Sequence, residues 1–166
     1  MQKVTILVDA QNVYYTTKQA YHCGFDYNQF WQQVTKDRKL VKAIAFSCER
    51  GDKKQTEFQN ILRAIGFEVK LKSYIQRSDG SSKCDWDVGI TIDALKYAEQ
   101  SDIIVLVSGD GDFALLADTL CSDYKTFVEV YGVPKLTAAS LVRSASKFIP
   151  IDNNLLLKQA TRSKSS

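Results

Sequence analysis

Apolar runs of strand length recur along the chain and alternate with segments long enough for helices. They cover residues 4–8, 41–48, 67–74, 103–107 and 127–131. Such alternation predicts a mainly parallel sheet in an α/β protein. The first and fourth runs are continuously apolar, which is typical of central strands covered on both faces. Apolar and lysine positions alternate over residues 69–72, so the third run is predicted to be an edge strand.

Helical periodicity occupies the segments around these runs. The predicted helices cover residues 27–36, 53–65, 86–98, 113–120 and 137–146, with Gly66 as a helix stop. In the helix over residues 86–98, we expect Val88, Ile92 and Leu95 to form the inner face. Residues 76–83 are polar and rich in turn formers, which predicts a mobile loop just before that helix.

These elements predict a single-domain, three-layer α/β/α sandwich with a mainly parallel sheet of five or six strands. With right-handed crossovers, a common order for the core strands is 3-2-1-4-5, so strands one and four are neighbours. The winding reverses between them, and ligands of open α/β sheets bind in that crevice. Residues 1–152 form the domain in this prediction, and residues 153–166 form a basic C-terminal tail that frays from Lys158 onward.

Length and composition fit one globular domain. The chain has 166 residues, of which 45% are hydrophobic and 25% charged. Its net charge of +3 is too small to indicate a nucleic-acid partner by itself. No apolar run approaches the roughly 20 residues needed to span a bilayer. The amino terminus shows no signal-peptide pattern, so we expect a soluble, cytoplasmic protein that does not contact a membrane.

The cysteines and the histidine of the chain limit which metal sites and catalytic mechanisms are possible. Cys23, Cys48, Cys84 and Cys121 lie far apart without a C-x-x-C pair, and we interpret them as free thiols. His22 is the only histidine, which excludes a two-histidine ribonuclease mechanism and a multi-histidine metal site. Oxygen ligands remain for any metal, and we assign no role to His22.

The first apolar strand ends in Asp9, and Asn12 follows three residues later. A turn at this point would bring both side chains to the crevice between strands one and four. Asp9 and Asn12 are equally good caps for a following helix, so the spacing leaves a functional and a capping interpretation open.

The strongest local signal follows the fourth strand, in the segment from Ser108 to Phe113. Asp110 and Asp112 are each preceded by a glycine, and a buried strand leads into them. Two glycine–aspartate pairs directly after a buried strand are more than helix capping requires. The later glutamate of a calcium loop is absent, as are a P-loop and the third glycine of a dinucleotide fingerprint. We therefore expect no nucleotide cofactor.

Asp87 opens the predicted helix over residues 86–98, where an acidic residue is also favoured by the helix dipole. Asp93 lies about 240° around an ideal helix from Asp87, so the two do not face one ion. Asp87 therefore ranks above Asp93 and Asp85 as a candidate metal ligand.

Three blocks of the sequence resemble the NYN domains of the LabA-like group, which are relatives of PIN-domain ribonucleases. The blocks cover residues 6–12, 87–95 and 107–113, and a weaker fourth covers residues 140–149. The resemblance implies a PIN-like fold and a ribonuclease dependent on Mg²⁺ or Mn²⁺. It also implies a metal site at Asp9, Asp87, Asp110 and Asp112 with Asn12 beside them. The chain departs from the family at Cys84-Asp85-Trp86 and at Ser146.

The resulting hypothesis is hydrolysis of RNA phosphodiester bonds, with single-stranded RNA as the expected partner. Asn12, Lys83 and Ser108 are the expected substrate contacts. Basic and aromatic side chains that would suit RNA are Arg50, Lys53, Lys54, Arg77, Tyr14, Tyr15 and Trp86. PIN-like proteins often pair, so a homodimer is among the assemblies that the resemblance implies. The alternatives are a non-catalytic RNA- or protein-binding module and a metal-dependent phosphatase.

Overall fold

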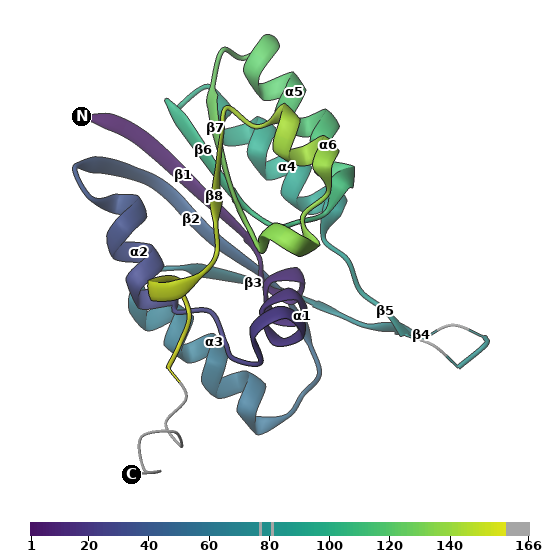
Figure 1. Ribbon diagram of the computed structural model, residues 1–166. Coiled ribbons are helices and arrows are strands. Elements are labelled where there is room, and N and C mark those ends of the chain that lie inside the picture. The colour runs from purple at the N-terminus through teal and green to yellow at the C-terminus, as the bar shows by residue number, and fades with distance from the viewer. Residues whose placement is uncertain (77, 81, 159–166) are drawn as a thin grey trace.

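A six-stranded parallel sheet forms the centre of the protein, in a computed structural model that describes residues 1–76, 78–80 and 82–158. Its order is β3-β2-β1-β6-β7-β8 (Figure 1). The strands are β1 (Gln2–Asp9), β2 (Arg38–Glu49), β3 (Glu68–Ser73), β6 (Ile103–Val107), β7 (Phe127–Gly132) and β8 (Lys147–Pro150). The predicted order of the first five strands is confirmed, with β8 added beside β7.

Helices cover both faces of the sheet (Figure 1). One face packs against α1 (Ala10–Tyr21), α2 (Tyr27–Thr35) and α3 (Lys53–Ile65). The other packs against α4 (Asp87–Ala98), α5 (Ala114–Ser122) and α6 (Ala139–Ser144). Short 3-10 helices lie at Gly111–Phe113, Pro134–Leu136 and Asn153–Leu155. Neighbouring strand residues alternate between the two cores, as Ile6 and Leu7 do in β1.

The central and edge strands lie where the pattern of apolar residues places them. β1 pairs with β2 and β6, and β6 pairs with β1 and β7, so both continuously apolar runs are central. β3 forms one edge of the sheet. Gly66 ends α3 with a φ of 138°, a conformation that favours glycine, which confirms the predicted helix stop.

Helix α1 was not among the predicted helices. Most of its side chains are polar, and only Ala10, Val13 and Thr17 are buried, so the helical periodicity is weak. Asp9 caps its start by accepting a hydrogen bond from the Asn12 N–H. The capping interpretation of Asp9 is therefore realised.

The predicted inner face of α4 is wrong. Val88 and Ile92 are 71% and 58% exposed, and Leu95 is only partly buried. Ile90 and Ala94 face the sheet instead and are fully buried. The predicted and the observed inner residues both follow helical spacing, so spacing alone does not distinguish the two faces of α4. In the structure, α4 is oriented so that the small Ala94 side chain packs closely against the sheet.

The segment predicted as a loop before α4 contains two short antiparallel strands, β4 (Ile75–Gln76) and β5 (Ser82–Lys83), which project from the body of the molecule (Figure 1). Arg77, Ser81 and the side chain of Lys83 lie outside the described residues.

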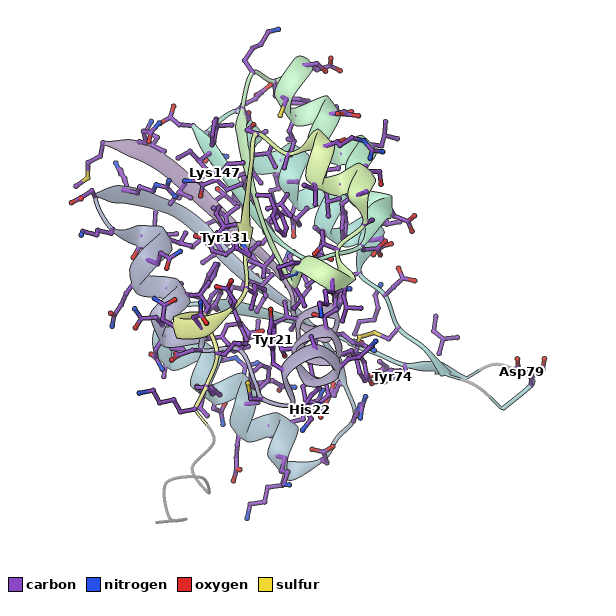
Figure 2. The ribbon with its side chains drawn as sticks, viewed as in Figure 1. Tyr21, His22, Tyr74, Asp79, Tyr131 and Lys147 are labelled. Atoms are coloured by element: carbon purple, nitrogen blue, oxygen red, sulfur yellow. A yellow bond between two sulfur atoms is a disulfide. The ribbon has the colours of Figure 1, made fainter. Side chains whose placement is uncertain are left out.

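A disulfide between Cys48 and Cys84 corrects the interpretation of all four cysteines as free thiols (Figure 2). Cys23 and Cys121 are free. The two bonded residues are 36 positions apart, a separation without any sequence signal, and only the fold brings the end of β2 beside the segment that leads into α4.

The packed part of the chain continues beyond residue 152. Leu155 is buried in the core on the α2 face, and the Leu157 N–H donates to the Gly24 carbonyl oxygen. Residues 159–166, the end of the predicted tail, lie outside the described residues. Within the described part, no helix combines the length and apolar character needed to cross a membrane.

Candidate metal centre

The loop after β6 places two carboxylates at the carboxyl edge of the sheet. Asp110 lies three residues beyond the end of β6, and its side chain accepts a hydrogen bond from the Asp112 N–H at 2.9 Å. This contact caps the short 3-10 helix Gly111–Phe113. Asp110 is half-buried and Asp112 is exposed.

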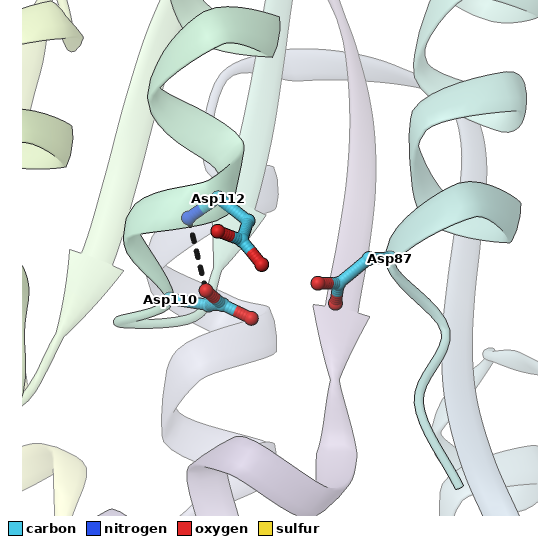
Figure 3. Close-up of side chains that lie close together, drawn as sticks. All are labelled: Asp87, Asp110 and Asp112. Atoms are coloured by element: carbon cyan, nitrogen blue, oxygen red, sulfur yellow. Dashed lines mark hydrogen bonds between the residues drawn. The ribbon is translucent and has the colours of Figure 1, made fainter.

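Asp87 brings a third carboxylate to the same place from the first turn of α4 (Figure 3). One oxygen each of Asp87, Asp110 and Asp112 lie within 4.8 Å of one another. The three side chains point toward a common space between α4 and the loop after β6 (Figure 3). We call this set the acidic cluster.

Burial and charge act together on Asp87. Burial raises the pKa of Asp87 to about 7, and the neighbouring carboxylates of Asp110, Asp85 and Asp9 add to the increase. Among the described residues, no lysine or arginine forms a salt bridge with a member of the acidic cluster. The cluster therefore concentrates negative charge that the described side chains leave uncompensated.

Asp9 lies beside the acidic cluster but not within its three-carboxylate group. Its side chain accepts a hydrogen bond from the Ser108 hydroxyl at 3.1 Å and the longer contact from the Asn12 N–H at 3.4 Å. Burial raises the pKa of Asp9 to about 6, against the lowering effect of these two hydrogen bonds. Asp9 thus joins the end of β1 to the end of β6.

Asn12 and Ser108 hold the loop that carries Asp110. The Asn12 Oδ1 atom accepts a hydrogen bond from the Gly109 N–H at 2.9 Å. The Ser108 hydroxyl, which donates to Asp9, also accepts from the Asp110 N–H at 3.2 Å. Two of the three expected substrate contacts, Asn12 and Ser108, therefore have positioning roles in the fold.

Gly109 is required by a close approach of two backbone segments. A Cβ atom at this position would lie 2.6 Å from the Leu136 carbonyl oxygen, closer than such atoms come in proteins. Neither Gly109 nor Gly111 has a positive φ. The glycines before the two aspartates thus provide space beside residues 136–138.

The other acidic candidates, Asp93 and Asp85, lie outside the three-carboxylate group. Asp93 is buried and pairs with Lys70 of β3 at 2.7 Å, so its role in the fold is an ion pair. Asp85 is exposed, and one of its carboxylate oxygens accepts a hydrogen bond from the Asp87 N–H at 3.3 Å. Lys83 belongs to β5, and its side chain is not described.

The sequence did not predict the contacts that hold residues 84–86, the lead-in to Asp87, in place. The Cys48–Cys84 disulfide ties this segment to the end of β2. The indole N–H of Trp86 donates to the Ser47 carbonyl oxygen at 2.9 Å, and the Lys72 ammonium lies 4.4 Å from the centre of the Trp86 ring. Trp86, a candidate for base stacking in the sequence, is therefore engaged in holding the start of α4.

The parallel three-layer fold and its acidic carboxyl edge define a protein of the PIN-like α/β class. Residues 3–152 match the NYN domain family, and the chain belongs to that family.

Two known proteins extend the comparison. The low amplitude and bright protein LabA of Synechococcus elongatus is 26% identical over 159 residues, which are 91% of this chain and 84% of that protein. A crystal structure of a protein of unknown function from Vibrio parahaemolyticus is 52% identical, with a TM-score of 0.90. The match covers 94% of this chain and 96% of that chain.

Proposed function

We propose that this protein is a ribonuclease that uses Mg²⁺ or Mn²⁺ to hydrolyse phosphodiester bonds of single-stranded RNA. The observation that carries the proposal is the convergence of Asp87, Asp110 and Asp112 within 4.8 Å, at the carboxyl edge of the sheet. The NYN domain belongs to a nuclease superfamily, which supports the assignment of this edge to nucleic-acid chemistry.

The donor set fits a hard divalent cation. Carboxylate oxygens are the ligands that Mg²⁺ and Mn²⁺ prefer, and imidazole or thiolate is not required. The raised pKa of Asp87 also favours a cation at this site, because a bound cation would offset the repulsion between Asp87 and Asp110. Asp87, Asp110 and Asp112 would hold the ion directly, and Asp9 completes the expected metal site from β1.

The chain's own residues have separate tasks in this proposal. A divalent cation at such a site lowers the pKa of bound water and offsets charge on the phosphate. Ser108 fixes Asp9 and the Asp110 backbone at the same time. Asn12 uses its carbonyl oxygen to hold Gly109, and we assign its amino group to a phosphate oxygen. Lys83 is assigned to the substrate on the basis of its position in the hairpin before α4.

The test is cleavage of labelled single-stranded RNA by the wild type and Asp110→Asn, each purified identically and assayed with Mn²⁺, Mg²⁺ or EDTA. Asparagine keeps the acceptor for the Asp112 N–H and removes the charge. Asp118→Asn is the matched control, since Asp118 is exposed on α5 outside the acidic cluster.

We expect metal-dependent cleavage by the wild type and the control, with a loss of at least about a hundredfold in Asp110→Asn. Equal cleavage by all three proteins would reject the assignment. RNA binding without cleavage by any of them would favour the non-catalytic binding module.

A further inference from the structure

A cavity of about 630 Å³ lies between α1, the end of β2 and the start of α3. Ala10 and Gln11 line it, and they directly follow Asp9 in the chain. The cavity therefore opens at the same carboxyl edge of the sheet as the acidic cluster, one strand further toward β3. Its volume is in the range of sites that bind small organic molecules.

Six aromatic side chains line the cavity. They are Tyr14, Tyr15, Phe25, Tyr27, Phe58 and Tyr74. Phe25 and Tyr27 are buried, while Tyr14 and Tyr15 are 54% and 46% exposed. Tyr74 lies between α1 and the start of the β4–β5 hairpin (Figure 2). Aromatic faces of this kind stack on nucleobases and tolerate different bases.

Arg50 supplies a positioned cation at this cavity. Its guanidinium donates to the Tyr15 hydroxyl at 2.7 Å and to the Tyr74 hydroxyl at 3.0 Å. It also lies 5.3 Å from the centre of the Tyr74 ring. Within the described part of the chain, Arg50 forms no salt bridge with a carboxylate. A guanidinium that is held in place and keeps its charge suits a phosphate group.

The charges around Arg50 favour an anion as well. Lys53 and Lys54 line the cavity from the first turn of α3. Asp52 also lines it, but its carboxylate caps α3 by accepting from the Gln55 N–H at 2.8 Å. The cavity thus combines aromatic surface with net positive charge.

Gln11 adds an unsatisfied polar atom. Its Oε1 atom is buried and has no hydrogen-bond partner among the described residues. A buried acceptor without a partner is costly and uncommon in a folded protein. A ligand that donates a hydrogen bond at this wall would remove the cost, and the exocyclic amine of adenine is such a donor.

We infer that this cavity binds an unstacked base of the RNA strand next to the phosphodiester at the acidic cluster. The base stacks on the tyrosines, its amine donates to Gln11, and a neighbouring phosphate pairs with Arg50. The location of the cleaved bond in this inference rests on the proposed ribonuclease function, whereas the base-binding site rests on the cavity itself.

The test measures binding of a fluorescent adenosine hexamer in EDTA, with a gel to show that the RNA stays intact. The test variants are Gln11→Met and Arg50→Met. Gln19→Met on α1 and Arg63→Met on α3 are the matched controls, because both residues are exposed and neither lines the cavity. Adenosine monophosphate is titrated separately, and the melting temperature of every variant is recorded.

We expect each test variant to weaken hexamer binding by about tenfold or more, and each control by less than about twofold. Gln11→Met should keep or raise the melting temperature, since it removes an unpaired acceptor. This separates a binding role from a merely structural one. Unchanged hexamer affinity in both test variants would overturn the inference.

The two proposals fail separately. Cleavage by the wild type, together with normal hexamer binding by Gln11→Met and Arg50→Met, would reject the base site and leave the ribonuclease intact. Loss of binding in both variants without any cleavage by the wild type would keep the base site and reject the ribonuclease. Adenosine monophosphate bound as tightly as the hexamer would overturn the assignment to an RNA strand in favour of a free nucleotide.

Discussion

Burial and the negative charge of its neighbours both act on Asp87 in the acidic cluster. Burial is the larger cause of its raised pKa, and Asp110 is the largest of the charged contributions. Because a proton or a cation relieves the same repulsion, the protonation of Asp87 and metal binding should compete.

The first prediction concerns the charge of Asp110. In EDTA, Asp110→Asn should have a melting temperature equal to the wild type or a few degrees higher, because it removes a carboxylate that repels Asp87. The same variant should lose Mn²⁺ binding in calorimetry. A lower melting temperature with Mn²⁺ affinity intact would contradict both parts.

The second prediction concerns pH. The native pKa of Asp87 is about 7, above the ordinary value of 3.8, so the folded state binds more protons than the unfolded state between these limits. The contribution of Asp87 to stability is therefore fully present below 3.8 and is lost as the pH rises through about 7.

Thermal melts in EDTA across this pH range test the direction in which the stability changes with pH. Relative to the wild type, Asp87→Asn should gain stability progressively as the pH rises from about 4 to about 8. A difference between the two proteins that stays constant with pH would show that Asp87 has an ordinary pKa.

At the residue scale, three of the four predicted metal ligands, Asp87, Asp110 and Asp112, lie close together, and the fourth, Asp9, lies beside them. Asp110 and Asp112 follow a buried central strand, so their place at the sheet edge is dictated by topology. Asp9 satisfies both interpretations left open by its spacing, since it caps α1 and lies beside the acidic cluster. The Ser108 and Asn12 contacts depend on side-chain geometry that spacing alone does not fix.

Among the elements, the lead-in to α4 determines where Asp87 lies. The segment is anchored by the Cys48–Cys84 disulfide and by Trp86, whose indole donates to Ser47. Strand order and helix positions follow from hydrophobic pattern and crossover handedness. The disulfide, the short hairpin and the buried side of α4 depend on tertiary contacts, which explains why the sequence did not reveal them.

The third prediction tests this anchor. Cys84→Ser should lower the free energy of unfolding by about 2–4 kcal/mol, as is typical for the loss of a disulfide, and should weaken Mn²⁺ binding by loosening the approach to Asp87. Chemical denaturation and Mn²⁺ calorimetry measure the two effects. Cys23→Ser is the control, because Cys23 is a free thiol. Equal stability of both variants would contradict the anchoring role.

The fourth prediction tests the close approach at Gly109. Gly109→Ala should lower the free energy of unfolding by about 1–3 kcal/mol and reduce cleavage, since the added methyl group forces the loop of Asp110 away from residues 136–138. Gly24→Ala is the control, where the added atom would meet only the flexible end of the Leu157 side chain. Similar denaturation midpoints for Gly109→Ala and the wild type would contradict this packing argument.

For the whole molecule, the sheet order places two features along one edge. The acidic cluster lies beyond β1 and β6, and the aromatic cavity lies beyond β1 and β2. A single strand of RNA that follows this edge would meet both.

The most direct test of the metal proposal is X-ray diffraction from crystals soaked in Mn²⁺, with an anomalous difference map and a parallel crystal of Asp110→Asn. We predict an anomalous peak within bonding distance of carboxylate oxygens from Asp87, Asp110 and Asp112 in the wild type, and its loss in the variant. A wild-type map without a peak between these three side chains at saturating Mn²⁺ would contradict the account.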